Sequence, residues 1–143
     1  LEDHIFKALA LGSPYVKAIG MARAPITAAM VGKNVGLRIT KENLPIYYGR
    51  YGNNVESVFV EASRLKKKFG KDFEDLPTGA IGLYTYNQRL AQGLKQLMCG
   101  ARKFAVQHIT RNDIAALTTE AARASGIRYV MDVDREEVER ILS

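Results

Sequence analysis

The sequence predicts a mainly helical protein with a short α/β piece near its N-terminus, on two observations. From about residue 53 onward, apolar residues recur every three or four positions, which is the spacing of one face of an α-helix. Before that point, a helical segment, a tight turn and a short apolar run follow one another, as in the second half of an α/β unit. We therefore divide the chain into residues 1–52, a terminal helix–strand corner with the loop after it, and residues 53–143, a helical extension.

The corner begins with a helix predicted over residues 2–11, in which Asp3 can accept hydrogen bonds from the first free N–H groups. Gly12 ends this helix, because glycine adopts the left-handed conformation at little cost. After a turn at Ser13-Pro14, residues 15–19 are predicted to form a short strand that Gly20 stops.

The rest of the first part is predicted to be less regular. Residues 24–31 are predicted to form a short helix, with Pro25 in its tolerated first turn. Residues 32–52 are expected to be irregular, because they contain the breakers Gly36, Pro45, Gly49 and Gly52.

The extension is predicted to hold two longer helices. The first runs from about residue 53 to Gly70, and the second from a cap at Thr78 to about Phe104. Gly82, Gly93 and Gly100 inside the second helix each cost about 1 kcal/mol relative to alanine. We expect such glycines where another backbone packs closely.

Two capping patterns mark the C-terminal part. Thr110-x-x-Asp113 predicts a capping box that opens a helix to about Ala124, closed by Gly126, before a short extended segment at residues 127–131. Asp134-x-x-Glu137 resembles a second cap, which opens the last helix.

Composition limits the class of protein. The 143 residues are 47% hydrophobic and 25% charged, which suits one ordinary globular domain. No apolar run approaches the roughly 18 residues of a membrane span, and no basic-then-apolar leader opens the chain, so we expect neither a membrane protein nor an export signal. A single cysteine, Cys99, excludes a disulfide framework within the chain and fits a reducing cytoplasm.

The net charge of +6 favours anionic partners. The densest basic run, Arg64 with residues 66–68, is interpreted as a solvated face late in a helix rather than as a nucleic-acid patch. The cluster of Tyr47, Tyr48, Arg50 and Tyr51 is typical either of base stacking or of a packed loop. A small basic module that binds nucleic acid or a partner protein is therefore the alternative hypothesis, although we do not expect nucleic acid as the partner.

The candidate binding site is the stretch Gly20, Met21, Ala22 and Arg23. Here a predicted strand ends in glycine and hands over to a helix, so that backbone N–H groups converge and an anion can approach closely. Arg23 adds a charge-assisted contact, and the combination suits a phosphate, although a glycine at this place also serves as a simple turn.

Other reactive residues give weaker signals. His4 and His108 lack neighbouring ligands, and no metal site or catalytic residue is predicted. Asp132 and Asp134 have a spacing that can share Mg²⁺, but Asp134 fits a helix cap better. Cys99 is interpreted as a small packed hydrophobe rather than a nucleophile.

Four stretches together resemble a known family: residues 4–12, 18–23, 69–84 and 96–104, which read HIFKALALG, AIGMAR, FGKDFEDLPTGAIGLY and QLMCGARKF. They resemble the C-terminal end of the FMN-binding domain of glutamate synthase, in the shorter glutamate synthase-like proteins of archaea and some bacteria. The resemblance covers most of the chain. Its first two stretches are shared widely among flavin-binding (β/α)₈ barrels, whereas the third is more specific to this subfamily.

The resemblance implies a flavoprotein of glutamate biosynthesis and nitrogen assimilation. FMN lies at the C-terminal mouth of a (β/α)₈ barrel in such enzymes and passes a hydride to an imine of 2-oxoglutarate, which makes L-glutamate. Residues 2–11 would be the seventh barrel helix and residues 15–19 the eighth strand. Gly20, Met21, Ala22 and Arg23 would then be the eighth-strand part of the FMN phosphate site.

The departures from the family define what this chain can do alone. Seven barrel strands, six barrel helices and the glutaminase domain are missing, and residues 20–52 contain no cysteine for an iron–sulfur cluster. We therefore expect the isolated chain to be inactive and free of flavin, with the rest of the parent barrel as its partner. An unpaired barrel strand would also favour a homo-oligomer.

Overall fold

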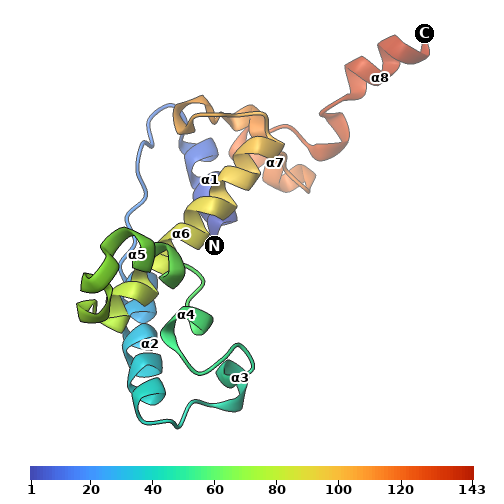
Figure 1. Cartoon of the computed structure of the whole chain (residues 1–143). Helices are drawn as coiled ribbons and strands as arrows, with labels where there is room; N and C mark the ends of the chain where they lie inside the picture. Colours follow the sequence, from blue (N-terminus) through green and yellow to red (C-terminus); the bar gives the residue numbers. More distant parts are fainter. The chain divides into compact units, whose positions relative to one another are not determined.

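A computed structural model describes residues 1–143 and shows a mainly helical protein, as predicted (Figure 1). The α-helices are α1 (Glu2–Gly12), α2 (Arg23–Thr40), α3 (Ile46–Gly49), α4 (Val55–Val58), α5 (Ala62–Phe69), α6 (Thr78–Gly100), α7 (Thr119–Ser125) and α8 (Arg135–Leu142). Four 3₁₀ turns join them: η1 (Gly70–Asp75), η2 (Val106–His108), η3 (Arg111–Asp113) and η4 (Val130–Asp132). None of the helices combines the length and the apolarity needed to cross a bilayer.

The chain forms two compact units. The first contains Leu1–Ile19 and Gly93–Ser143, and the second contains Gly20–Gln92, so α6 contributes to both. The boundary proposed between residues 52 and 53 concerns the parts of a parent protein, and it stays a prediction.

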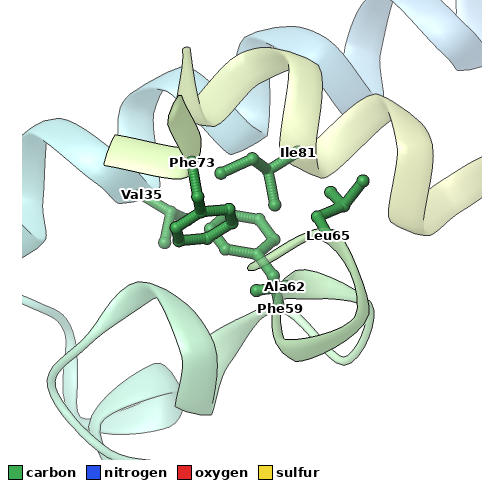
Figure 2. Packing of buried hydrophobic residues seen from close by; sticks show 6 residues of the cluster. All are labelled: Val35, Phe59, Ala62, Leu65, Phe73 and Ile81. Carbon is green, nitrogen blue, oxygen red and sulfur yellow. The ribbon is translucent and has the colours of Figure 1, made fainter. Parts of the chain in front are cut away.

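Six residues form the buried core of the second unit (Figure 2). They come from α2, from the segment around α5, from η1 and from α6, and they are Val35, Phe59, Ala62, Leu65, Phe73 and Ile81. Phe59 sits between α4 and α5, where the backbone is extended (φ −103°, ψ 110°) and interrupts the helix predicted from residue 53 to Gly70. This break lets the Phe59 ring enter the core beside Phe73.

Helices α2 and α6 approach each other backbone to backbone in the second unit. A Cβ atom added to Gly82 would lie 2.9 Å from the Cα of Gly32, and one added to Gly79 would lie 2.9 Å from the carbonyl oxygen of Ala29. Side chains at these positions would push the two helices apart. The close backbone approach predicted at Gly82 is therefore confirmed.

The same contact explains why α2 is longer than predicted. Residues 32–40 were expected to be irregular, but α2 continues through Gly32 and Gly36 to Thr40, so that expectation is wrong for these nine residues. Both glycines are buried, and Gly36 lies directly against the Thr78 side chain. The packing between helices thus outweighs the local cost of glycine in a helix.

The core of the first unit consists of α1 packed on the end of α6. Its buried residues are Phe6, Leu9, Ala10, Met98 and Ile109. Here a Cβ atom added to Gly93 would lie 2.8 Å from the Cγ of Glu2, while one added to Gly100 would meet nothing within 4 Å. The prediction of a neighbouring backbone is therefore wrong at these two glycines. Helix α6 also ends at Gly100, before the predicted Phe104, and a turn with Arg102 at φ +54° follows it.

The predicted strand at residues 15–19 is absent, so the α/β piece of the expected fold class is wrong. After α1, the N–H groups of Tyr15 and Val16 donate to the carbonyl of Gly12 at 2.8 and 2.9 Å, which makes a turn. A strand needs a neighbour for its backbone groups. The structure shows only one isolated parallel bridge, between Ala116 and Tyr129, and no piece of a barrel sheet.

The helix ends confirm some of the predicted caps and correct others. The Asp113 carboxylate accepts from the N–H of Thr110 at 2.7 Å, but this box opens only η3, and α7 starts later under a cap from Thr118. Gly126, at φ +68°, closes α7 as predicted. In contrast, Asp134 precedes α8 without a capping bond from its side chain.

At the start of the chain, the helix predicted over residues 2–11 is confirmed as α1, but Asp3 does not cap it. Asp3 lies in the first turn and accepts from Lys7 at 3.3 Å. Thr78, the predicted cap of α6, is likewise the first residue of that helix, and the carbonyl of Pro77 accepts its first hydrogen bonds.

Candidate functional site

The four candidate phosphate ligands lie at the start of α2. Gly20 and Met21 precede the helix, Ala22 is its N-cap and Arg23 is its first residue. All four are exposed, and a Cβ atom on Gly20 would meet nothing within 4 Å. The structure therefore brings the predicted residues together on an open surface at a helix N-terminus, although no strand leads into it.

The electrostatics of this helix end favour an anion. The side chain of Ala22 cannot cap the helix, and the first turn contains no acidic residue. The first intrahelical bond runs from the N–H of Ile26 to the carbonyl of Ala22 at 3.2 Å, so the N–H groups of Arg23 and Ala24 are free to meet a ligand. These dipoles add positive charge at the helix end that also carries Arg23, whose guanidinium enters none of the ion pairs of the chain.

This helix end can contact one edge of a phosphate, but it cannot enclose the whole group. Two amides and one guanidinium supply fewer donors than a buried phosphate needs, and the exposed residues exclude no water from a ligand. Residues of another chain segment would have to complete any site for a larger ligand.

A hollow that the sequence analysis missed lies along α2 at the start of α6. It has a volume of about 610 Å³, and small residues including Ala29, Gly36 and Gly79 form part of its lining. Met30 and Leu37 add apolar side chains, and Lys33 adds a cation. The glycines at positions 32, 36, 79 and 82 carry the signal for it, but this signal becomes visible only when the two distant segments are compared with each other.

The tyrosine cluster divides into a packed and an exposed part. Tyr48 packs against the core of the second unit, which agrees with the packed-loop interpretation. Tyr47 and Tyr51 are exposed, and the Arg50 guanidinium lies 5.0 Å from the centre of the Tyr47 ring. The exposed pair keeps the base-stacking interpretation open.

Half of the basic run on α5 is paired within the chain. Lys66 donates to the Glu56 carboxylate at 2.5 Å, and this hydrogen bond raises the pKa of Lys66 and lowers the pKa of Glu56. Arg64 lies 3.7 Å from Glu61. Such pairing suits a solvated helix face.

The histidines, Asp132 and the cysteine do not form a cluster. His4 is exposed on α1 and His108 lies in η2, and no group of His, Cys, Asp or Glu could hold a metal ion. Asp132 pairs with Arg135 at 3.0 Å. Cys99 is exposed, so its interpretation as a packed hydrophobe is wrong, because the last turns of α6 bury the face that carries Met98.

Comparison of the chain with protein-family models, with curated proteins and with solved structures found no match. The resemblance to glutamate synthase, and everything that it implies, thus stays a prediction that rests on the residues quoted above.

Proposed function

We propose that this chain is the C-terminal part of the FMN-binding barrel domain of a glutamate synthase-like oxidoreductase. Gly20, Met21, Ala22 and Arg23 would contribute part of its FMN phosphate site. When bound and reduced by an electron donor, FMN would supply the hydride that reduces an imine of 2-oxoglutarate to L-glutamate. We expect the parent enzyme in the cytoplasm, in keeping with the single cysteine.

The observation that carries the proposal is the open N-terminus of α2. Its free N–H groups, the adjacent Arg23 and the absence of any acid in the first turn suit a phosphate dianion. Gly20 leaves the approach clear, since nothing lies within 4 Å of a Cβ atom added there.

The proposal gives the isolated chain an incomplete site. No residue of this chain is assigned to catalysis, and its exposed phosphate ligands have no wall against which an isoalloxazine ring could be held. The partner would be the rest of the parent barrel, in which residues 15–19 would find the neighbouring strands that they lack here.

The experiment compares the chain with its parent. We expect the purified chain to bind neither FMN nor riboflavin tightly in equilibrium dialysis, whereas the parent should purify yellow. In the parent, Arg23→Gln should lower the ratio of flavin to protein and weaken FMN binding by roughly tenfold, because a charge-assisted contact to phosphate is lost.

Two controls make this test specific. Lys41→Gln removes a cation from the other end of α2 and should leave the flavin content unchanged. Riboflavin lacks the phosphate, so its affinity should not respond to Arg23→Gln. A parent without flavin, or an Arg23→Gln variant that binds FMN as before, contradicts the proposal, and stoichiometric flavin on the isolated chain contradicts the incomplete site.

One observation favours a second candidate function, a basic module that binds single-stranded nucleic acid. The exposed rings of Tyr47 and Tyr51 beside Arg50 could stack on bases. Titration with single-stranded DNA and RNA tests this, because binding driven by phosphates must weaken steeply as salt is raised. Binding that is absent at low salt rejects the second candidate.

A further inference from the structure

The last helix of the chain has an exposed apolar face. Val138, Ile141 and Leu142 lie at positions i, i+3 and i+4 of α8, so they share one face, and Ile141 and Leu142 are 72% and 81% exposed. No residue of α8 is buried. A helix of eight residues is too short to be stable by itself in water and depends on packing of its amphipathic face.

The groove along α2 is a mostly apolar surface that could receive such a helix face. Its lining residues include Ala29, Met30, Lys33, Leu37, Pro77 and Gly79. Its volume of about 610 Å³ falls within the range of hollows that accept apolar groups. Met30 is 67% exposed at its edge. The small residues in its lining would let a helix approach closely.

The positive charge around this groove favours an acidic helix as its occupant. Helices α2 and α6, which flank the groove, contain no acidic residue at all, and α2 carries Lys33 and Arg38 near it. In contrast, the segment 132–143 carries five of the 15 acidic residues of the chain. On α8, Glu137 and Glu139 lie on the two sides of the apolar face, because successive residues are rotated by roughly 100° around a helix axis.

We propose that α8 of one copy of this chain docks into the α2 groove of a second copy, with Val138, Ile141 and Leu142 in the groove and Glu139 beside Lys33. Each copy offers one groove and one α8. When two copies exchange α8 reciprocally about a two-fold axis, two identical contacts form, and such an exchange closes the assembly as a dimer. The proposal goes beyond the FMN site and does not depend on it.

The first test is the oligomeric state of the purified chain by sedimentation equilibrium, at concentrations up to about 1 mM. We expect a monomer–dimer equilibrium. Ile141→Glu on α8 and Met30→Glu in the groove should each raise the dissociation constant by at least about tenfold, because a charge would be buried against apolar groups. Leu117→Glu, at an exposed position that belongs neither to α8 nor to the lining of the groove, is the matched control and should change nothing.

A mixing experiment separates a direct contact from a loss of folding. The Met30→Glu variant keeps its α8, and the Ile141→Glu variant keeps its groove. An equimolar mixture should therefore form a heterodimer through one intact contact, although neither variant dimerises well alone. Circular dichroism of each variant should match that of the unchanged chain.

A charge exchange tests the register. Lys33→Glu and Glu139→Lys should each weaken the dimer severalfold, more at low salt than at high salt, and the double variant should recover most of the loss. A chain that stays monomeric at every concentration overturns the proposal. So does a dimer that ignores Ile141→Glu and Met30→Glu, or a double charge variant no tighter than the single ones.

Discussion

Helix α6 makes two different kinds of contact along its length. In the second unit, its first turns meet α2 backbone to backbone, through Gly79 and Gly82 against Ala29 and Gly32. In the first unit, its last turns meet α1 through side chains such as Met98 on Phe6 and Leu9, and Gly93 faces only the flexible side chain of Glu2. Glycine is therefore a packing requirement in one half of this helix and an ordinary helix weakness in the other.

The largest expected effect is in the aromatic core that the close α2–α6 contact helps to enclose. Phe73 is 4% exposed and packs with Phe59 and Ile81 (Figure 2). Phe73→Ala should lower the free energy of unfolding by about 3–5 kcal/mol, through lost burial and the cavity left behind. Urea denaturation measures this. Phe104→Ala, at an exposed position, is the control and should stay within about 0.5 kcal/mol of the unchanged protein.

The second prediction tests the two halves of α6 directly. Gly82→Ala places a Cβ atom 2.9 Å from the Cα of Gly32, where backbone must move, and we expect it to destabilise the protein by about 1–3 kcal/mol. Gly93→Ala meets only the Glu2 side chain, from its Cγ outward, and this side chain can rotate away. This variant should gain up to about 1 kcal/mol of stability, because alanine favours a helix. Equal effects of the two substitutions in urea denaturation would contradict the comparison.

Local pattern predicts most helices and a close approach at Gly82, but it does not indicate the partner of Gly82 in α2. The apolar spacing in α1 and α6 can be interpreted from neighbouring residues alone. Gly32 and Gly36 carry no such information, because their neighbours lie more than 40 residues later. Gly32 packs against the backbone of residues 78–82, and Gly36 against the side chain of Thr78. A prediction from neighbouring residues takes into account only the cost of glycine in a helix, so it ends α2 before Gly32 instead of at Thr40.

The same limit applied to the strand and the candidate site. Residues 15–19 have the composition of a strand, but strand formation depends on a neighbour that this chain does not provide. The placement of Gly20–Arg23 at a helix start depends only on nearby residues and was predicted correctly. The groove along α2 combines two distant segments, Ala29–Thr40 and Pro77–Ala80, so no local pattern could indicate it.

A third prediction sharpens the contrast in the first unit, where polar side chains hold the loops after α6. The Asp113 carboxylate accepts from the Thr110 N–H at 2.7 Å and lies 3.4 Å from Lys103. Asp113→Ala should therefore cost about 1–2 kcal/mol, the range for a lost cap, whereas Asp134→Ala removes no capping bond and should cost less than about 0.5 kcal/mol. Thermal and urea unfolding of the two variants measure the difference.

The smallest expected effect concerns the ion pair of Glu56 and Lys66 in the second unit. The hydrogen bond from Lys66 lowers the pKa of Glu56 in the folded chain, so the folded state holds this carboxylate ionised more strongly than the unfolded state does. The stabilisation is therefore present above the unfolded pKa and is lost as the pH falls through the folded pKa. Both side chains are partly exposed, which limits the contribution through screening. Glu56→Gln should lower stability slightly at neutral pH and low salt, and the difference from the unchanged chain should vanish in acid and shrink in high salt. A difference that persists in acid would show that Glu56 acts through packing rather than through its charge.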